Sequence, residues 1–449
     1  MIHVNRVHIV GIGGIGASAM AKWYLLRGAE VSGSDRTSTD ITQELADLGA
    51  TIYEGHEAAH VPDGIELILY SPAVPADNPE RAMGTERGIP QLAYPEFLAE
   101  LSKERKTIAI SGTNGKSTTT AMIAKILIDA GYDPVVFLGT KSRDLSHGNF
   151  HNGQGVWMVV EACEYREHMK HIAPHIAVIT NIEADHLDYY RDVDHIRDAF
   201  QSWINSVKPF EGYVVLNGAD AKSLELTHKD AVYFEAEHVR VTEGLQSFSA
   251  KVKEDGRATN VALQLNLPGV FNAQNAAAAC VVGRLARVPE TQIKQSLASF
   301  KGTWRRFEHV GQWQGADIYS DYAHHPSAIR GTIQGAREYF GDRRLVVLFE
   351  PHQHSRTKEL FNDFVDAFGG ADHVILNEIY RVAGRTEDDH VSSQDLVSAI
   401  KAKYPALEIE YTANHTTARE ALEKSVQSGD VVIIMGAGTI DEVARDLVR

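Results

Sequence analysis

The chain is predicted to fold as an α/β protein of about three domains, and three observations lead to this prediction. Its 449 residues are too many for one ordinary hydrophobic core. Its hydrophobic fraction of 43% supplies material for several packed interiors. Short β-branched runs alternate with helical patterns along the whole chain, which favours parallel sheets covered by helices.

The first predicted strand, at residues 7–10, enters a turn at 11–16 with the sequence Gly-Ile-Gly-Gly-Ile-Gly. A helical pattern follows, and a second strand ends at Asp35. Glycines with this spacing are typical of a Rossmann-like turn, which holds a diphosphate at the N-terminus of the next helix. Asp35 lies where an acidic residue often contacts a ribose. The pattern predicts phosphate binding without identifying the nucleotide, and a purely structural turn is the alternative.

Residues 107–118 carry the most specific signal, with the sequence Thr-Ile-Ala-Ile-Ser-Gly-Thr-Asn-Gly-Lys-Ser-Thr. The two glycines allow the loop to wrap closely around phosphate. The helix that begins near Lys116 would direct its free N–H groups at that phosphate, and Lys116 adds a full charge. The hydroxyl of Ser117 or Thr118 is a magnesium ligand in such loops. The loop therefore predicts a P-loop nucleotide site, although Ile110 stands where the standard motif has its first glycine.

Polar side chains follow two buried strands of this second block. Glu161 and Glu164 come after a strand at 156–160, and the segment 180–188, which contains His186, comes after the next strand. Ligands of open α/β sheets bind at this carboxyl end. A carboxylate there could hold magnesium on the P-loop nucleotide, and Glu161 is our first choice ahead of Glu164. The structural alternatives are a solvated helix start for the acids and an ordinary structural histidine.

A third block begins near residues 302–306. Arg305 and Arg306 could grip phosphate there, or form a solvated linker. The polar segments 321–326 and 350–357 each follow a predicted strand of this block. Taken singly, each segment is a weak signal of a site.

Composition excludes several classes of function. Lys and Arg total 44 against 60 Asp and Glu, and the net charge of −16 argues against general binding to nucleic acid or anionic membrane. Two cysteines make no disulfide framework, and the 21 histidines show no zinc-ligand spacing. No apolar run approaches the roughly 18 residues of a membrane helix, and no signal peptide is visible. We therefore expect a soluble cytoplasmic protein; its oligomeric state stays open.

Together these motifs resemble the Mur ligases of bacterial cell-wall synthesis, in order and over nearly the whole chain. The resemblance rests on the glycine turn, the P-loop, Ser-Gly-Ser-Asp at 32–35, Ser-Pro-Ala-Val at 71–74, and the segments 180–188, 321–326 and 351–357. Within the family, the chain is most similar to the members that attach L-alanine to UDP-N-acetylmuramate. The murein-peptide ligases, which attach a recycled tripeptide, share most of these motifs and are the alternative.

The resemblance implies three domains. These are a Rossmann-like domain over 1–104 for the UDP-sugar, a central P-loop ATPase-type α/β domain over 105–303, and a Rossmann-like C-terminal domain over 304–449 for the amino acid. It implies an enzyme that uses ATP and Mg²⁺ to convert the carboxylate of UDP-N-acetylmuramate into an acyl phosphate. The amine of L-alanine then attacks, giving a peptidoglycan precursor, ADP and phosphate.

The resemblance also assigns residues to each ligand. The UDP-sugar would contact Gly11, Gly13, Gly14, Ile15, Gly16, Asp35 and Ser71. ATP would contact Gly112, Thr113, Asn114, Gly115, Lys116, Ser117, Thr118, Asn275, Arg306 and Asp321. Magnesium would be held by Ser117, Glu161 and His186, and catalysis would depend on Lys116, His186 and Arg306. The L-alanine site would be lined by Tyr322, His324, His352 and Arg356.

The chain departs from the usual residues of this family at four positions. It has Asn114 and Phe271 where histidine is usual, Ser117 where threonine is usual, and Cys163 where aspartate is frequent. Asn114 and Ser117 occur in other Mur ligases, so the implied use of ATP is unaffected. Phe271 alters the implied surroundings of the adenine.

Two alternatives belong to other functional classes. A nicotinamide-dependent oxidoreductase would account for the first glycine turn, but it leaves the Lys116 loop unexplained. A non-enzymatic ATP-dependent binding protein would account for that loop. ATP turnover that depends on both a UDP-sugar and an amino acid would exclude it.

Overall fold

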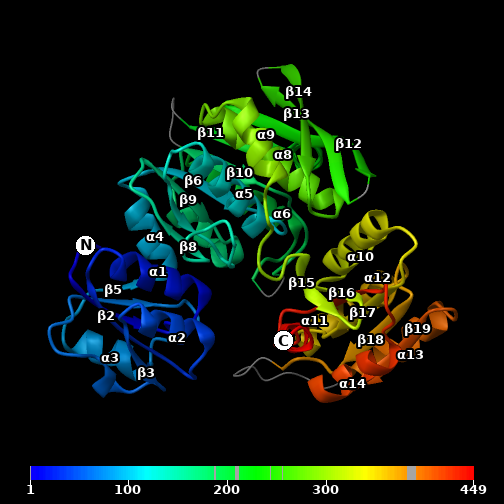
Figure 1. Cartoon of the computed structure of the whole chain (residues 1–449). Helices are drawn as coiled ribbons and strands as arrows, with labels where there is room; N and C mark the ends of the chain where they lie inside the picture. The colour runs from blue at the N-terminus through cyan, green and yellow to red at the C-terminus, as the bar shows by residue number, and fades with distance from the viewer. Residues whose placement is uncertain (1, 187–188, 208–211, 243, 255, 382–390) are drawn as a thin grey trace. The chain divides into compact units, whose positions relative to one another are not determined.

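The computed structural model describes residues 2–186, 189–207, 212–242, 244–254, 256–381 and 391–449 (Figure 1). These residues divide into two compact units. The first contains 1–237, 249–263 and 274–300, and the second contains 238–248, 264–273 and 301–449. Three sheets run through them, and the predicted α/β class with three domains is confirmed. No helix in the described ranges is long and apolar enough to cross a membrane.

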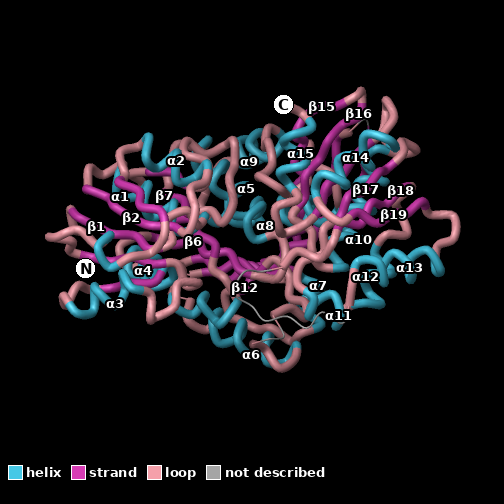
Figure 2. Tube along the Cα trace, turned by 90° about the horizontal axis from the view of Figure 1, so that it is seen from below, coloured by secondary structure: helices cyan, strands magenta, loops and turns pink. Residues whose placement is uncertain are grey.

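The first sheet is fully parallel and has the strand order β3-β2-β1-β4-β5. Its strands are β1 (Arg6–Val10), β2 (Glu30–Asp35), β3 (Thr51–Glu54), β4 (Leu67–Tyr70) and β5 (Gln91–Ala93). Its helices are α1 (Ile15–Leu25), α2 (Asp40–Asp47), α3 (Pro79–Glu86) and α4 (Tyr94–Ser102). In Figure 2, α1 and α2 lie on one side of these strands and α3 lies on the other. The order reverses at β1, so the turn after β1 lies where ligands bind in such sheets.

The second sheet has nine strands in the order β14-β13-β12-β11-β10-β6-β9-β7-β8. They are β6 (Lys106–Ser111), β7 (Val135–Phe137), β8 (Phe150–Asn152), β9 (Trp157–Glu161), β10 (Ile176–Ile179), β11 (Tyr213–Asn217), β12 (Ala231–Thr242), β13 (Leu245–Glu254) and β14 (Arg257–Leu265). The α-helices are α5 (Lys116–Asp129), α6 (Val193–Ile204), α7 (Gly218–Ser223), α8 (Val270–Leu285) and α9 (Glu290–Ala298). β6 is central and pairs in parallel with β10 and β9, so the loop after β6 opens at the middle of the sheet edge.

The third sheet has the order β15-β16-β20-β17-β18-β19 and is parallel except for the β15–β16 pair. Its strands are β15 (Glu308–Trp313), β16 (Ala316–Asp321), β17 (Leu345–Phe349), β18 (His373–Asn377), β19 (Glu408–Thr412) and β20 (Val431–Met435). Its helices are α10 (Pro326–Phe340), α11 (His354–Glu359), α12 (Phe361–Ala367), α13 (Ser393–Lys403), α14 (His415–Ser425) and α15 (Asp441–Leu447). Every residue of β17 and β20 is buried, because helices cover both faces of a parallel sheet.

The first two sheets share one hydrophobic core. The ring of Phe97 on α4 lies 5.5 Å from that of Trp23 on α1 and 5.8 Å from that of Phe137 on β7, measured between centroids. Phe137 in turn contacts Phe150 on β8 at 5.1 Å. Each such ring buries roughly 150–250 Å² of surface. This continuous aromatic packing joins the first sheet to the β7–β8 side of the second sheet, within one compact unit.

Candidate functional site

The glycine turn after β1 is held by backbone bonds and by one carboxylate. The N–H groups of Gly11 and Ile12 donate to the carbonyl of Ser34, at 2.8 and 2.9 Å. Gly13 N–H donates to Asp35 Oδ2 at 2.8 Å. Gly11 has φ +76°, a conformation that favours glycine. The ring of Tyr94 lies against Gly16, where a Cβ atom would meet it at 3.1 Å. The turn therefore has the tight, small-residue geometry that a diphosphate loop requires.

Asp35 and Ser71 lie at this turn, as their positions after β2 and β4 predict. Asp35 is already engaged by backbone, since Oδ1 accepts from Arg36 N–H at 2.8 Å while Oδ2 accepts from Gly13. Ser71 packs beside Gly11, where a Cβ atom would lie 3.3 Å from the Ser71 Cβ. The ribose contact of Asp35 stays a prediction. What the structure adds is that this carboxylate fixes the conformation of the loop.

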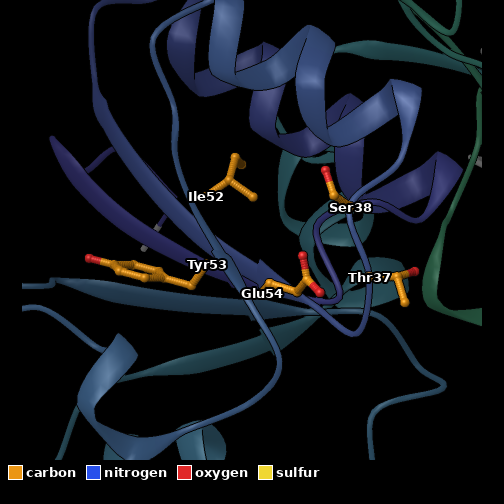
Figure 3. A pocket seen from close by; sticks show the side chains of 5 residues that line it. All are labelled: Thr37, Ser38, Ile52, Tyr53 and Glu54. Carbon is orange, nitrogen blue, oxygen red and sulfur yellow. The ribbon is translucent and has the colours of Figure 1, made fainter.

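A pocket of about 180 Å³ lies in the first domain, between the segment after β2 and the strand β3. Figure 3 shows its lining side chains, which come from the segment after β2 and from β3. They are Thr37, Ser38, Ile52, Tyr53 and Glu54. Sequence analysis did not identify this pocket, because no motif marks its residues.

The first sheet also buries a polar network that the sequence analysis missed. The Glu80 carboxylate is fully buried and accepts from Ser34 Oγ at 2.6 Å. His8 Nε2 and His56 Nδ1 lie 2.8 and 3.1 Å from its oxygens. Burial opposes the charge of Glu80, but the hydrogen bonds from His8 and Ser34 outweigh it and hold the pKa of this carboxyl below its ordinary value. The network supports the end of β2, whose Ser34 carbonyl carries the glycine turn.

The loop after β6 has the geometry of a phosphate-binding loop. Gly112 and Gly115 have φ +130° and +82°, and α5 begins at the next residue, Lys116. A Cβ atom on Gly112 would lie 2.2 Å from Thr180 Oγ1, so only glycine fits. Asn114 N–H donates to Asn181 Oδ1 at 2.9 Å. The loop is therefore held from the end of β10.

Asn275 on α8 also contacts this loop. A Cβ atom on Gly115 would lie 2.3 Å from Asn275 Oδ1, and Asn275 is almost fully buried. The structure thus brings Asn275 to the P-loop from 160 positions further along the chain. Ser117 and Thr118 are buried in the first turn of α5, and Thr113 donates its N–H to the carbonyl of Asn181.

Lys116 lies at the centre of a charged cluster. Its Nζ donates to the carbonyls of Gly112 and Thr113, at 2.5 and 3.0 Å, and to Glu164 Oε1 at 2.9 Å. His186 Nε2 lies 3.6 Å from the same carboxylate oxygen. Burial works against the charge of Lys116, but the Glu164 carboxylate outweighs it and raises the pKa of Lys116. Burial lowers the pKa of His186, but the interaction with the Glu164 carboxylate and the charge of Asp185 together outweigh burial, so this pKa is raised.

The two candidate metal carboxylates have different partners. Glu161 Oε2 accepts from Ser117 Oγ at 3.0 Å, and its Oε1 accepts from Gly139 N–H at 2.5 Å. Glu164, the second choice from the sequence, is the one beside Lys116 and His186. Burial disfavours its charge, but Lys116 and His186 together lower the pKa of Glu164. Asp188, the last acid of the 180–188 segment, lies outside the described residues.

These residues fit a magnesium ion bound with a nucleotide. Glu164 Oε2 is buried and has no hydrogen-bond partner within the described part of the chain. Such an atom is costly unless a ligand or ion satisfies it. Groups of three or more His, Cys, Asp or Glu side chains that could hold a metal ion are absent from the described ranges. A magnesium ion that keeps waters and takes phosphate oxygens needs only one or two carboxylates.

In the third sheet, aromatic and basic side chains gather after β16 and β17. The rings of Tyr322 and His324 lie 5.2 Å apart, and those of His324 and His352 lie 6.1 Å apart. Tyr380, which sequence analysis missed, stacks on His352 at 5.4 Å. Burial, then the nearby charge of Arg356, lowers the pKa of His324 to about 3. His324 is therefore neutral near pH 7, and Nδ1–H donates to the Tyr322 carbonyl at 2.9 Å.

The two arginines before β15 have separate roles. Arg305 is largely buried and donates through Nη2 to the carbonyls of Gly436 and Gly438, at 2.5 and 2.9 Å. Its guanidinium is therefore committed to the backbone after β20, which disfavours the phosphate role considered for it. Arg306 lies over the ring of Tyr322 at 4.9 Å and interacts with Asp321. Asp321 accepts from the N–H groups of Phe307 and Ala323, both at 2.7 Å.

Comparison with known families accounts for this arrangement. Residues 6–106 match the model described as Mur ligase family, catalytic domain, residues 110–283 match the Mur ligase middle domain, and 305–438 match the Mur ligase glutamate ligase domain. The chain belongs to the Mur ligase family. Its middle domain, which contains the Lys116 loop, is an ATP-binding domain. The resemblance inferred from the motifs is thereby confirmed.

Relatives of this Mur ligase match it over nearly its full length. The UDP-N-acetylmuramate–L-alanine ligase of Geotalea uraniireducens (strain Rf4) is 40% identical, and the alignment covers 99% of this chain and 98% of the relative. The enzyme of the same name from Clostridium perfringens (strain 13 / Type A) is 34% identical over 98% and 97%.

Two solved structures also match over nearly the full length. The UDP-N-acetylmuramate–alanine ligase of Thermotoga maritima has a TM-score of 0.83 at 29% identity, covering 99% of this chain and 98% of that one. A murein peptide ligase from Psychrobacter arcticus 273-4 has a TM-score of 0.71 at 22% identity, covering 99% and 98%, and this likeness shows the fold alone.

Proposed function

We propose that this chain is an ATP-dependent ligase that joins L-alanine to the carboxylate of UDP-N-acetylmuramate in peptidoglycan precursor synthesis. The observation that supports the proposal is that two glycine loops with the geometry of phosphate-binding loops, one after β1 and one after β6, lie in a single compact unit. The full-length relatives at 34–40% identity are ligases of this substrate pair. The domain limits 1–104, 105–303 and 304–449 belong to the same proposal.

The chemistry requires activation of the sugar carboxylate. A carboxylate is a poor acyl donor to an amine, because an oxide-like group would have to leave. A carboxylate oxygen therefore attacks the γ-phosphorus of ATP, ADP leaves, and an acyl phosphate forms. The neutral amine of L-alanine then attacks the acyl carbon, phosphate leaves, and the amine gives up a proton. Holding the reactants in order and away from water protects the acyl phosphate from hydrolysis.

Lys116 is our candidate for stabilising charge on the transferring phosphoryl group. In the structure its Nζ reaches back to the carbonyls of its own loop and to Glu164. The residues assigned to ATP besides Lys116 are Gly112, Thr113, Asn114, Gly115, Ser117, Thr118, Asn275, Arg306 and Asp321. A preorganised charge of this kind acts strongly in a buried site.

Ser117, Glu161 and His186, with Glu164 added from the geometry, would hold magnesium. The bound ion would supply charge neutralisation for the phosphoryl group. Glu161 accepts a hydrogen bond from the Ser117 hydroxyl, and Glu164 compensates the charge of Lys116 and lies 3.6 Å from His186 Nε2. These carboxylates would thus hold the lysine, the imidazole and the hydroxyl in place for the triphosphate.

The first glycine turn would take the UDP diphosphate through Gly11, Gly13, Gly14, Ile15 and Gly16, with Asp35 and Ser71 beside it. The pocket of Figure 3 is our candidate for the uridine end, because Thr37 and Ser38 lie two and three positions after Asp35. In the second unit, Tyr322, His324, His352 and Arg356 would line the L-alanine site. Arg356 suits the substrate carboxylate, since a guanidinium pairs with it in a bidentate way.

Phosphate release with UDP-N-acetylmuramate and ATP tests the proposal. The amino acids L-alanine, L-serine and glycine are compared with the murein tripeptide. L-alanine is expected to give the highest kcat/KM. A clear preference for the tripeptide would make the chain a murein-peptide ligase. If the enzyme shows no turnover that requires both the UDP-sugar and an amine, the proposed ligase activity is refuted.

A further inference from the structure

One buried asparagine, Asn149, lies between the two phosphate loops of the first unit. It precedes β8 directly and is fully buried. Its Nδ2 donates to the carbonyl of Ile15 at 2.6 Å and lies 2.9 Å from Ser18 Oγ. Ile15 is the first residue of α1 and a member of the glycine turn. The amide group therefore holds the beginning of the helix whose N-terminus faces the expected diphosphate.

A buried lysine fixes the orientation of this amide. Lys22, on α1, is fully buried, and its Nζ donates to Asn149 Oδ1 at 2.9 Å. The same Nζ donates to Glu44 Oε1 at 2.6 Å and to the carbonyl of His147 at 3.0 Å. All three N–H bonds of the ammonium are thereby used. The amide cannot flip without losing the bond from Lys22 and placing its nitrogen against that ammonium.

From Asn149, hydrogen bonds continue to the P-loop. Its backbone carbonyl accepts from Leu138 N–H at 3.0 Å. The next residue, Gly139, donates its N–H to Glu161 Oε1 at 2.5 Å, and Glu161 Oε2 accepts from Ser117 Oγ at 3.0 Å. A Cβ atom on Gly139 would lie 2.8 Å from this carboxylate, so a larger residue would displace the Glu161 side chain. A continuous path of bonds thus runs from the start of α1 to the first turn of α5.

Tyr94 on α4 lies beside the glycine turn, where its ring packs on Gly16, and burial, followed by the charge of Glu161, raises its pKa. Hydrogen bonds of the β7–β8 segment connect the two loops in addition to the general apolar core.

We propose that Asn149 is a positioning residue for phosphoryl transfer, which sets the placement of the diphosphate loop relative to the P-loop. The inference rests on the proposed function. Asn149 touches neither reacting group in this arrangement. Asn149 holds the glycine turn, which would orient the sugar carboxylate. Through Leu138 and Gly139 it also positions Glu161, whose carboxylate orients the Ser117 hydroxyl. An error of about 1 Å between two reacting groups is enough to cost about 100-fold in rate.

The test compares Asn149→Ala, Asn149→Asp and Lys22→Met with wild type in the full chain. Asn149→Asp retains an acceptor for Lys22 but places an oxygen against the Ile15 carbonyl. The matched control is Asn152→Ala on β8, whose Nδ2 contacts the carbonyl of Leu26 at 3.5 Å, beyond the far end of α1. Hydroxylamine, added without L-alanine, traps the acyl phosphate as a hydroxamate. Calorimetry gives the Kd of each nucleotide ligand, and thermal melts report folding.

Both Asn149 variants are expected to form hydroxamate at least 10-fold more slowly in single turnover, with each Kd within threefold of wild type. Lys22→Met is expected to slow the same step by about threefold or more, because the amide is no longer fixed. Asn152→Ala should leave rate and affinities within twofold. If the Asn149 variants do not fold, the rate of hydroxamate formation by Lys22→Met tests the inference by itself.

Wild-type rates of hydroxamate formation in the folded variants would overturn the inference. Rate losses that only parallel losses in Kd and melting temperature would overturn it too, because a purely structural role predicts that pattern. A wild-type enzyme that forms no hydroxamate would refute the proposed function, and this inference with it.

Discussion

Replacing Glu164 by glutamine is the most informative single perturbation of the ATP site. The side chain keeps its size and one acceptor for Lys116 Nζ, now 2.9 Å from Glu164 Oε1. What it loses is the negative charge that faces the Lys116 ammonium and the His186 imidazole. The variant therefore separates charge from packing.

The expected magnitude follows from the hydrogen bond between Lys116 Nζ and Glu164 Oε1. Hydrogen bonds to charged groups contribute about 1.5–3 kcal/mol, against about 0.5–1.5 for neutral ones, so this contact loses about 1–1.5 kcal/mol. At about 1.4 kcal/mol per tenfold, this corresponds to about a 5- to 12-fold lower rate of phosphoryl transfer. The loss arises because Lys116 holds a less well-defined position.

The assay is phosphate release at increasing magnesium concentration, with Glu161→Gln as the matched variant. Glu161 contacts the Ser117 hydroxyl and the Gly139 N–H, and its charge acts on Lys116 less strongly than that of Glu164. Glu161→Gln is expected to raise the magnesium concentration for half-maximal rate, with much of kcat recovered at saturation. Glu164→Gln is expected to lower kcat even at saturating magnesium. Full recovery of kcat in Glu164→Gln would refute the view that this carboxylate organises Lys116.

Three further predictions concern the other parts of the molecule. Gly13→Val should weaken UDP-sugar binding and leave the Kd of ATP nearly unchanged, because its Cβ atom would lie 2.9 Å from Asp35 Oδ2; calorimetry showing equal losses for both ligands would contradict this. Arg356→Ala should raise the KM for L-alanine by about 30-fold or more, from the roughly 2–5 kcal/mol of a lost charged contact, with little change for ATP; a loss of ATP affinity alone would place Arg356 elsewhere. His324 has a pKa of about 3 in the folded protein against an ordinary 6.5, so the unfolded state binds the extra proton between these values. The stability of the C-terminal domain should therefore fall as pH drops from about 6.5 towards 3, and His324 contributes up to about 1.4 kcal/mol per pH unit to this fall. In melts recorded at several pH values, His324→Gln should reduce the dependence of stability on pH. An unchanged pH dependence in this variant would contradict the prediction.

The sequence predicted the local features of the site well. The loop after β6 needs φ > 0 at Gly112 and Gly115, and β-branched residues before it form a buried strand, so its position and shape follow from neighbouring residues. The glycine turn after β1 was predictable for the same reason. The α/β class followed from the alternation of strand and helix patterns, which the three sheets confirm.

Features that depend on distant residues could not be predicted. Lys22 and Asn149 are 127 positions apart, and neither belongs to a motif that signals their contact. The choice between Glu161 and Glu164 depends on side-chain direction just after β9, which spacing along the sequence does not reveal. Arg305 and Arg306 are adjacent and chemically identical, yet only the fold shows that Arg305 is committed to the carbonyls after β20.

The central claim is that the sugar carboxylate is activated as an acyl phosphate. The most direct measurement uses UDP-N-acetylmuramate labelled with ¹⁸O in both carboxylate oxygens, incubated with ATP, L-alanine and the enzyme. Attack of a carboxylate oxygen on the γ-phosphorus, followed by amine attack at carbon, transfers one labelled oxygen to the released phosphate. Mass spectrometry of that phosphate should therefore show one ¹⁸O atom per molecule, together with the L-alanyl amide product. Unlabelled phosphate accompanying amide formation would contradict the account.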